Sequence, residues 1–216
     1  GSDITIVSST GVLEFASAPD YETQTSYSAT VTVSDGTNTA TQEITVNVTN
    51  VNDVAPEFTS NATFSAAENQ TAVGTVTAND AEGDTVTFTI SGTDLEITTA
   101  GVLTFASAPD YETVTSFTAT VTASDGINST TQDITVNVTN VNDNSPVITS
   151  NASFSAEENQ TAIGTVTATD DDGDTVTFSV SGSELQITSA GVLSFVSAPD
   201  YESKDTYTAT VTASDG

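Results

Sequence analysis

The sequence predicts an all-β protein built from tandem β-sandwiches. Three observations lead to this prediction. Apolar and small polar residues alternate in several runs, the same segments recur at a fixed spacing, and no stretch of useful length shows the apolar period of a helix.

The alternation is clearest in the middle of the chain. Residues 84–92 (DTVTFTISG), 116–126 (SFTATVTASDG) and 133–140 (DITVNVTN) alternate β-branched, aromatic or small apolar residues with Thr, Ser or Asn, which indicates strands with one buried face. Residues 98–105 (TTAGVLTF) place Ala-Gly between short apolar pieces, which is a hairpin signal. About seven short strands in roughly 90 residues is typical of a β-sandwich.

The repeats are offset by 90 residues, as the Ala-Pro-Asp-Tyr-Glu motifs at Asp20, Asp110 and Asp200 show. We predict that the chain is a window from a longer array, with a complete repeat between two partial ones. The predicted domains are 1–53 (second part of a repeat), 54–143 (complete repeat) and 144–216 (first part of a third repeat).

The charge balance excludes several partners. The chain has 30 acidic residues and one basic residue, Lys204, for a net charge of −29. Phosphate and anionic surfaces are bound through Lys and Arg, so neither nucleic acid nor an anionic membrane surface is expected as a partner. No run approaches the ~20 apolar residues of a membrane span.

Catalysis is not expected either. The chain has no His and no Cys, which excludes catalytic triads and zinc chemistry. The run Asp170–Asp174 opens like an EF-hand loop, but its twelfth position is Ser181 instead of the required Glu. Asp110 and Glu112 recur with the repeat, which argues against a glycosidase pair.

The acidic residues gather at predicted turns and recur at the same phase of every repeat. Acids also solvate loops, and composition alone does not separate that interpretation from a binding site. The amide side chains beside these acids and the scarcity of basic partners favour a hard cation such as calcium, which takes six to eight oxygen ligands. A bound cation would also relieve the repulsion among the carboxylates.

Five segments together resemble the cadherin repeat: AAENQTAVG (66–74), TANDAEGD (77–84), APDYET (108–113), VTASDG (121–126) and VTNVNDNSP (138–146). All five elements of the family's signature are present, in the family's order. The resemblance implies a seven-stranded Greek-key sandwich with its chain ends at opposite poles. It also implies calcium ions at each inter-repeat junction, which turn the string of domains into an elongated, stiff rod.

The resemblance implies metal ligands at two junctions. Those carried to the second junction are Glu68, Asp110, Glu112, Asn140, Asn142, Asp143, Asp170, Asp172 and Asp215, with backbone oxygens from Val141 and Asn144. Those carried to the first junction are Asp20, Glu22, Asn50, Asn52, Asp53, Asp80, Glu82 and Asp125. We expect the first junction to be incomplete, because its leading Glu would lie before residue 1.

The sequence departs from the family pattern at several ligand positions. Asn50 and Asn140 replace the usual first Asp of the linker, which should weaken one ion. Glu82 replaces the second Asp of its pair, and Val54 replaces the counterpart of Asn144, which is tolerable if that position acts through its carbonyl oxygen.

The function expected from the resemblance is structural. The chain is predicted to be an extender segment of a secreted or surface adhesin, or of an extracellular filament, and it is similar to bacterial cadherin-like arrays. One alternative is a calcium-dependent carbohydrate-binding module, for which Tyr21, Tyr111 and Tyr201 are the recurring aromatics. Another is head-to-tail or lateral self-association, in which incomplete ends complete one another through exposed strand edges.

Overall fold

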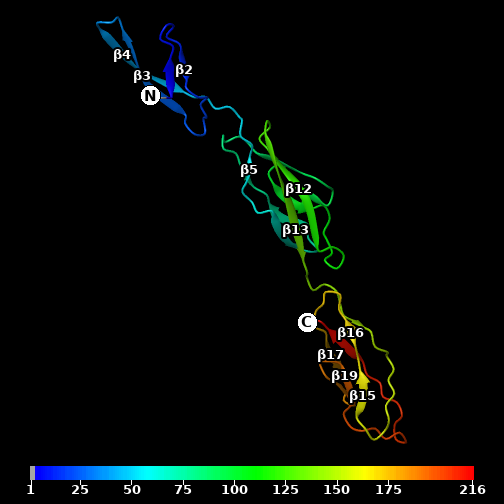
Figure 1. The fold of residues 1–216 in the computed structure, drawn as a ribbon. Helices are drawn as coiled ribbons and strands as arrows, with labels where there is room; N and C mark the ends of the chain where they lie inside the picture. Colours follow the sequence, from blue (N-terminus) through cyan, green and yellow to red (C-terminus); the bar gives the residue numbers. More distant parts are fainter. Residues whose placement is uncertain (1–2) are drawn as a thin grey trace. The chain divides into compact units, whose positions relative to one another are not determined.

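The computed structural model describes residues 3–216, which divide into two compact units. The first unit consists of the chain up to Ser65 together with Thr71–Ser107 and Ser116–Asn137, and the second consists of Ala66–Gln70, Ala108–Thr115 and Val138–Gly216. All regular elements among the described residues are β-strands (Figure 1), as the alternating pattern predicts. These residues include no helix long and apolar enough to cross a membrane.

Two antiparallel pairs form the N-terminal part of the first unit. β1 (Ile4–Ile6) pairs with β2 (Leu13–Phe15), and β3 (Ser26–Ser34) pairs with β4 (Thr39–Asn47). Leu13 is 42% exposed here, whereas Leu103, at the equivalent position 90 residues later, is fully buried.

Residues 57–139 form two larger sheets and a short pair of strands. One sheet has the order β10 (Leu95–Ile97), β11 (Val102–Phe105), β7 (Ala72–Thr75). The other has the order β6 (Thr63–Ala67), β13 (Ser129–Thr139), β12 (Ser116–Ser124), β9 (Thr87–Ile90). β5 (Glu57–Phe58) pairs with β8 (Ala78–Asn79). Neighbouring strands that are not consecutive in the sequence require crossovers between the sheets, as in a Greek key.

The core of the first unit is built from the apolar positions of the alternating runs. Val121, Ile134 and Val136 are at most 1% exposed. The ring centres of Phe105 and Phe117 lie 5.3 Å apart. Each fully buried side chain of this kind stabilises the fold by about 1.5–3 kcal/mol.

The predicted Ala-Gly hairpin lies between β10 and β11, and its glycine is required by geometry. Gly101 has φ +88°, and a Cβ there would lie 2.2 Å from the carbonyl oxygen of Val76. At this close approach the Val76 N–H donates to the Gly101 carbonyl oxygen at 2.8 Å, and this bond connects the turn to the end of β7.

The β5–β8 pair, the β9–β12 pair and the three-stranded sheet have counterparts in the second unit. β14 (Val147–Ile148) pairs with β16 (Ala168–Thr169), and β17 (Thr177–Val180) pairs with β20 (Val211–Ser214). A third sheet has the order β15 (Ala162–Thr165), β19 (Val192–Phe195), β18 (Leu185–Ile187). Val166, Leu193 and Phe195 are buried in this unit.

Candidate metal centre

Glu68 connects three segments of the second unit. It follows β6 directly, and its side chain is only 3% exposed. The Val141 N–H donates to Glu68 Oε1 and the Tyr111 N–H donates to Oε2, both at 2.7 Å. The Glu68 N–H itself donates to the Thr139 carbonyl oxygen at 3.1 Å. One carboxylate therefore holds the turn at 108–115 and the linker at 140–144.

The linker is also bound to the loop that follows β16. The N–H groups of Asp143 and Asn144 donate to Asp172 Oδ2 at 3.0 and 2.8 Å. The side-chain amide of Asn140 donates to the Asp172 carbonyl oxygen at 2.8 Å. The Asn144 N–H, the Asn144 side-chain amide and the Asp143 N–H lower the pKa of the Asp172 carboxyl, because they stabilise its charged form.

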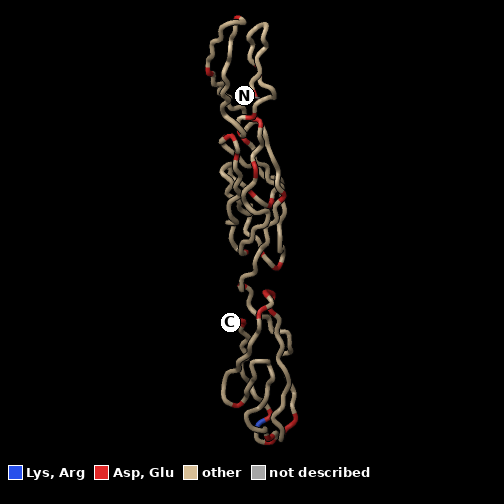
Figure 2. The backbone as a smooth tube through the Cα atoms, turned by 60° about the vertical axis from the view of Figure 1, so that its left-hand side comes forward, with Lys and Arg blue, Asp and Glu red and all other residues tan. Residues whose placement is uncertain are grey.

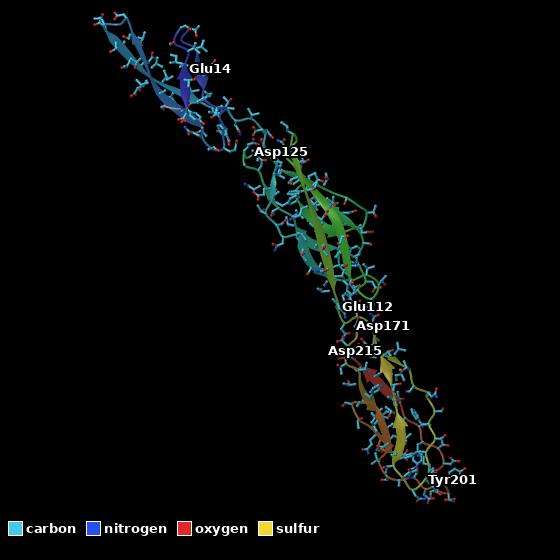
Figure 3. The ribbon with its side chains drawn as sticks, in the orientation of Figure 1. Glu14, Glu112, Asp125, Asp171, Tyr201 and Asp215 are labelled. Carbon is cyan, nitrogen blue, oxygen red and sulfur yellow. The ribbon has the colours of Figure 1, made fainter. Side chains whose placement is uncertain are left out.

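These contacts bring four carboxylates from separate segments together. One oxygen each of Glu68, Glu112, Asp143 and Asp172 lies within 4.8 Å of the others. Desolvation raises the pKa of the Glu112 carboxyl, and the charges of Glu68 and Asp172 raise it further. The cluster therefore carries concentrated negative charge. Figure 3 labels Glu112 in this region of the second unit, together with Asp171, the neighbour of Asp172.

The first unit contains two close acidic groups, of which the first is equivalent to part of the four-carboxylate cluster. Glu22, Asp53 and Glu82 form one, and Asp80, Glu82 and Asp125 form the other. The Asp53 N–H donates to Glu82 Oε1 at 2.7 Å, which repeats the contact of Asp143 with Asp172. Desolvation is the main cause that raises the pKa of the Glu22 carboxyl.

Asp80 has a buried oxygen without a partner. The residue is 6% exposed, and its Oδ1 accepts hydrogen bonds from the Glu82 and Asp84 N–H groups, both at 3.0 Å. Within residues 3–216 its Oδ2 has no hydrogen-bond partner, and the same holds for Oδ2 of Asp170 in the second unit. A buried acceptor that is left unsatisfied is costly, so these atoms fit a metal ion better than a purely structural role.

Other residues predicted as ligands lie outside the four-carboxylate cluster. Asp110 accepts hydrogen bonds from the Glu112 N–H and the Thr113 hydroxyl, and Asp20 makes the same contacts one repeat earlier. Asp170 lies in a group with Asp172 and Asp174. Among the described residues, nine predicted ligands either have no carboxylate or belong to none of the close acidic groups: Asp20, Asn50, Asn52, Asp110, Asn140, Val141, Asn142, Asn144 and Asp215.

The structure also adds residues that were not predicted as ligands. Asp174 joins Asp170 and Asp172, and Glu158, Asp200 and Glu202 form a further exposed group. The amide of Asn69 donates to Asp143 Oδ2, from a backbone with φ +60°. The recurring Glu-Asn pair was the signal in the sequence for Asn69, but it did not show where the amide points.

The only basic side chain of the sequence lies elsewhere. Lys204 donates to Glu184 at 2.7 Å and lies 4.4 Å from the centre of the Tyr207 ring. It is the single blue position in Figure 2, where the red acidic positions recur along the chain. No Lys or Arg side chain is therefore available to neutralise the carboxylates of the two linkers.

Comparisons with known proteins show what this chain is similar to. Residues 142–216 match the family described as Bacterial Ig domain. Human Protocadherin-15 is 36% identical over 155 residues, which cover 64% of this chain and 8% of that protein. The human Cadherin EGF LAG seven-pass G-type receptor 2 is 31% identical over 236 residues, which cover 98% of this chain and 8% of that protein. The chain thus spans less than a tenth of the length of these relatives.

Solved cadherin structures share the fold. The EC22-24 segment of mouse cadherin-23 superposes with a TM-score of 0.71 at 22% identity, covering 100% of this chain and 78% of that one. Extracellular cadherin domains 3-6 of Protocadherin Gamma B2 give a TM-score of 0.77 at 20% identity, covering 100% and 62%. The chain belongs to the cadherin family and is a tandem array of extracellular cadherin-like repeats.

Proposed function

We propose that this segment binds calcium at its linkers and that the bound ions make the linkers rigid. The observation that carries the proposal is the approach of Glu68, Glu112, Asp143 and Asp172 to within 4.8 Å without a protein cation. Two unit charges 4 Å apart repel by about 1 kcal/mol in water and about 4 kcal/mol near a protein surface. A divalent ion would turn this repulsion into attraction.

The donor set fits calcium. The atoms offered are carboxylate and amide oxygens from several loops, and calcium accepts six to eight such ligands in flexible geometry. Magnesium prefers a strict octahedron and keeps its water, so the larger ion fits this arrangement better. The unpartnered oxygens of Asp80 and Asp170 supply two further acceptors, one near each linker.

The mechanical consequence follows from which segments hold the ligands. In the second unit the carboxylates come from the residue after β6, the turn at 108–115, the linker and the loop after β16. An ion shared by all four would resist any change in their separation. We therefore propose a calcium-rigidified extender of an extracellular adhesin or filament, in which the linkers divide repeats 1–53, 54–143 and 144–216.

Calorimetry tests this function. Calcium that binds the folded chain and not the unfolded chain raises the melting temperature by mass action. We expect a higher melting temperature in millimolar calcium than in EDTA, and a smaller rise in magnesium. Sodium chloride should restore stability only partly, since it screens charge without chelation. Equal melting temperatures in EDTA and calcium would refute the proposal.

The partners of the segment stay predictions. Self-association is one, and one related solved structure is of a protocadherin gammaB7 cis-dimer. Polysaccharide binding is the other, and Tyr201 is 65% exposed while Tyr111 is half-buried. Sedimentation of the chain at increasing concentration, and a pull-down on insoluble polysaccharide with and without calcium, distinguish the two.

A further inference from the structure

The two linkers are nearly identical in sequence but differ at one position that faces the carboxylates. Residues 48–53 and 138–143 both read VTNVND, and the next residue is Val54 in one linker and Asn144 in the other. The backbone contacts are the same in both. Asp53 and Val54 donate to Glu82 Oε1 at 2.7 and 3.2 Å, as Asp143 and Asn144 donate to Asp172.

The side chain of Asn144 lies among three carboxylates. Its Nδ2 donates to Asp143 Oδ1 at 2.9 Å, to Asp172 Oδ1 at 3.2 Å and to Glu112 Oε2 at 3.3 Å. The amide of Asn69 approaches the remaining oxygen of Asp143. Val54 has no polar side-chain atom to offer to Glu22, Asp53 and Glu82, and it is 38% exposed.

An amide in this position offsets part of the repulsion among the carboxylates, as a cation would. Hydrogen bonds to charged acceptors are about twice as strong as those between neutral groups, and Nδ2 has two N–H bonds to share. The amide adds no charge, so it links carboxylates that would otherwise repel one another. Each carboxylate has about four acceptor positions, so the amide leaves room for a metal ion.

We propose that Asn144, assisted by Asn69, is a positioning residue that keeps the 140–144 linker assembled in the absence of calcium. The 50–54 linker lacks this amide, because Val54 occupies the position that Asn144 has in the second linker. The second linker is therefore preorganised and the first is not. A site whose competent state is only partly populated binds its ligand more weakly by that fraction, so the second linker fills at a lower calcium concentration. This last step rests on the proposed calcium function, whereas the role of the amide does not.

A reciprocal pair of variants tests the proposal in the full chain. Asn144→Val removes the amide from the second linker, and Val54→Asn adds it to the first. The readout is hydrogen exchange, measured by NMR in EDTA, at the Asp143 and Asp53 N–H groups. Both amides precede the substituted residue, so their intrinsic exchange rates stay unchanged. We expect exchange at Asp143 to rise about threefold to tenfold in Asn144→Val, and exchange at Asp53 to fall by a similar factor in Val54→Asn.

A third variant separates the amide from the shape of the side chain. Asn144→Asp has the size of Asn but adds a carboxylate to the cluster. If the amide matters as a donor, Asn144→Asp exchanges faster than Asn144→Val in EDTA, and calcium reverses that order. If only packing matters, Asn144→Asp behaves like the parent, which overturns the proposal.

The calcium arm distinguishes this proposal from the function on which it partly rests. One outcome is that the substitutions change exchange in EDTA but calcium never does. That result supports the role of Asn144 and refutes calcium binding. The opposite outcome is that calcium slows exchange in every variant, while Asn144→Val equals the parent in EDTA. That result supports calcium binding and overturns the role of Asn144.

Discussion

Replacement of Glu68 by Gln should destabilise the second unit far more than the same change one repeat later. Glu68 is 3% exposed, and its two oxygens accept from the Val141 and Tyr111 N–H groups, each at 2.7 Å. Glu158 is exposed, and its carboxylate accepts one hydrogen bond from the described part of the chain, from the Tyr201 N–H at 3.0 Å. The pair is a matched control within one chain.

The magnitude follows from these contacts. Gln keeps one acceptor oxygen and turns an NH₂ group toward the other N–H, so one hydrogen bond to a charged group, about 1.5–3 kcal/mol, is lost. The second bond loses its charge assistance, about 1 kcal/mol. Removal of one of four clustered charges returns about 1 kcal/mol. The expected net loss is about 1.5–3 kcal/mol, against at most about 0.5 kcal/mol for Glu158→Gln, whose amide oxygen can still accept from Tyr201.

Urea unfolding in EDTA, followed by circular dichroism and hydrogen exchange at Val141, measures both variants. EDTA removes the contribution of any bound ion, so the difference reports the hydrogen bonds together with the repulsion among the carboxylates. Equal midpoints for Glu68→Gln and Glu158→Gln would show that Glu68 does not connect the segments as described.

Three further changes have defined outcomes. Asp143→Ala removes a central carboxylate from a residue outside every strand, so calcium affinity in titration calorimetry should fall by at least about tenfold, or about 1.4 kcal/mol, while circular dichroism stays β-rich; unchanged affinity would contradict the assignment. Gly101→Ala adds a Cβ 2.2 Å from the Val76 carbonyl oxygen at φ +88° and should cost about 2–4 kcal/mol in denaturant melts, whereas Gly11→Ala, with φ +75° and no atom within 4 Å, should cost about 1 kcal/mol. The N–H groups of Asn38 and Thr37, with the Asn38 amide, lower the pKa of Asp35, so its carboxylate stabilises the β3–β4 turn above the unfolded pKa of about 3.9, and this contribution is lost as the pH falls through the lower folded pKa. A carbon NMR titration of the Asp35 carboxyl with a midpoint at or above the ordinary value would refute that account.

The strand positions were largely predictable from alternation, and the deviations have a local cause. β12 follows its predicted run, whereas β9 begins at Thr87 although the alternation begins at Asp84. The Asp84 N–H is held by Asp80 Oδ1 at 3.0 Å, which keeps the chain in the loop for longer than the pattern suggests. β13 begins earlier than predicted, at Ser129, because the turn after β12 is closed by bonds from Ile127 and Asn128 to Asp125.

The candidate site was predictable in outline but not in its internal assignment. Recurrence and the family pattern pointed to the loops in which the carboxylates lie close together. Asp110 and Glu112 stand two residues apart in one turn, and nothing in the sequence says which of them faces the linker. The structure uses Asp110 to close the turn and leaves Glu112 for the cluster. The amides of Asn69 and Asn144 were equally hidden, since a polar linker residue that faces solvent has the same sequence signature.

The distribution of charge predicts which parts of the fold depend on the proposed calcium ions. β9, β11 and β12 contain no acidic residue, and Asp133, the single acid of β13, accepts a hydrogen bond from the Thr120 hydroxyl at 2.7 Å. Their buried faces are apolar, so we expect the sheets to stay folded without a counter-ion. The carboxylates that lie close together are in turns and linkers, where few apolar contacts oppose local opening. As the calcium concentration is lowered, the linkers should therefore loosen while the sheets stay folded. Hydrogen exchange at the Val141 N–H should rise at a higher calcium concentration than exchange at the Val121 N–H.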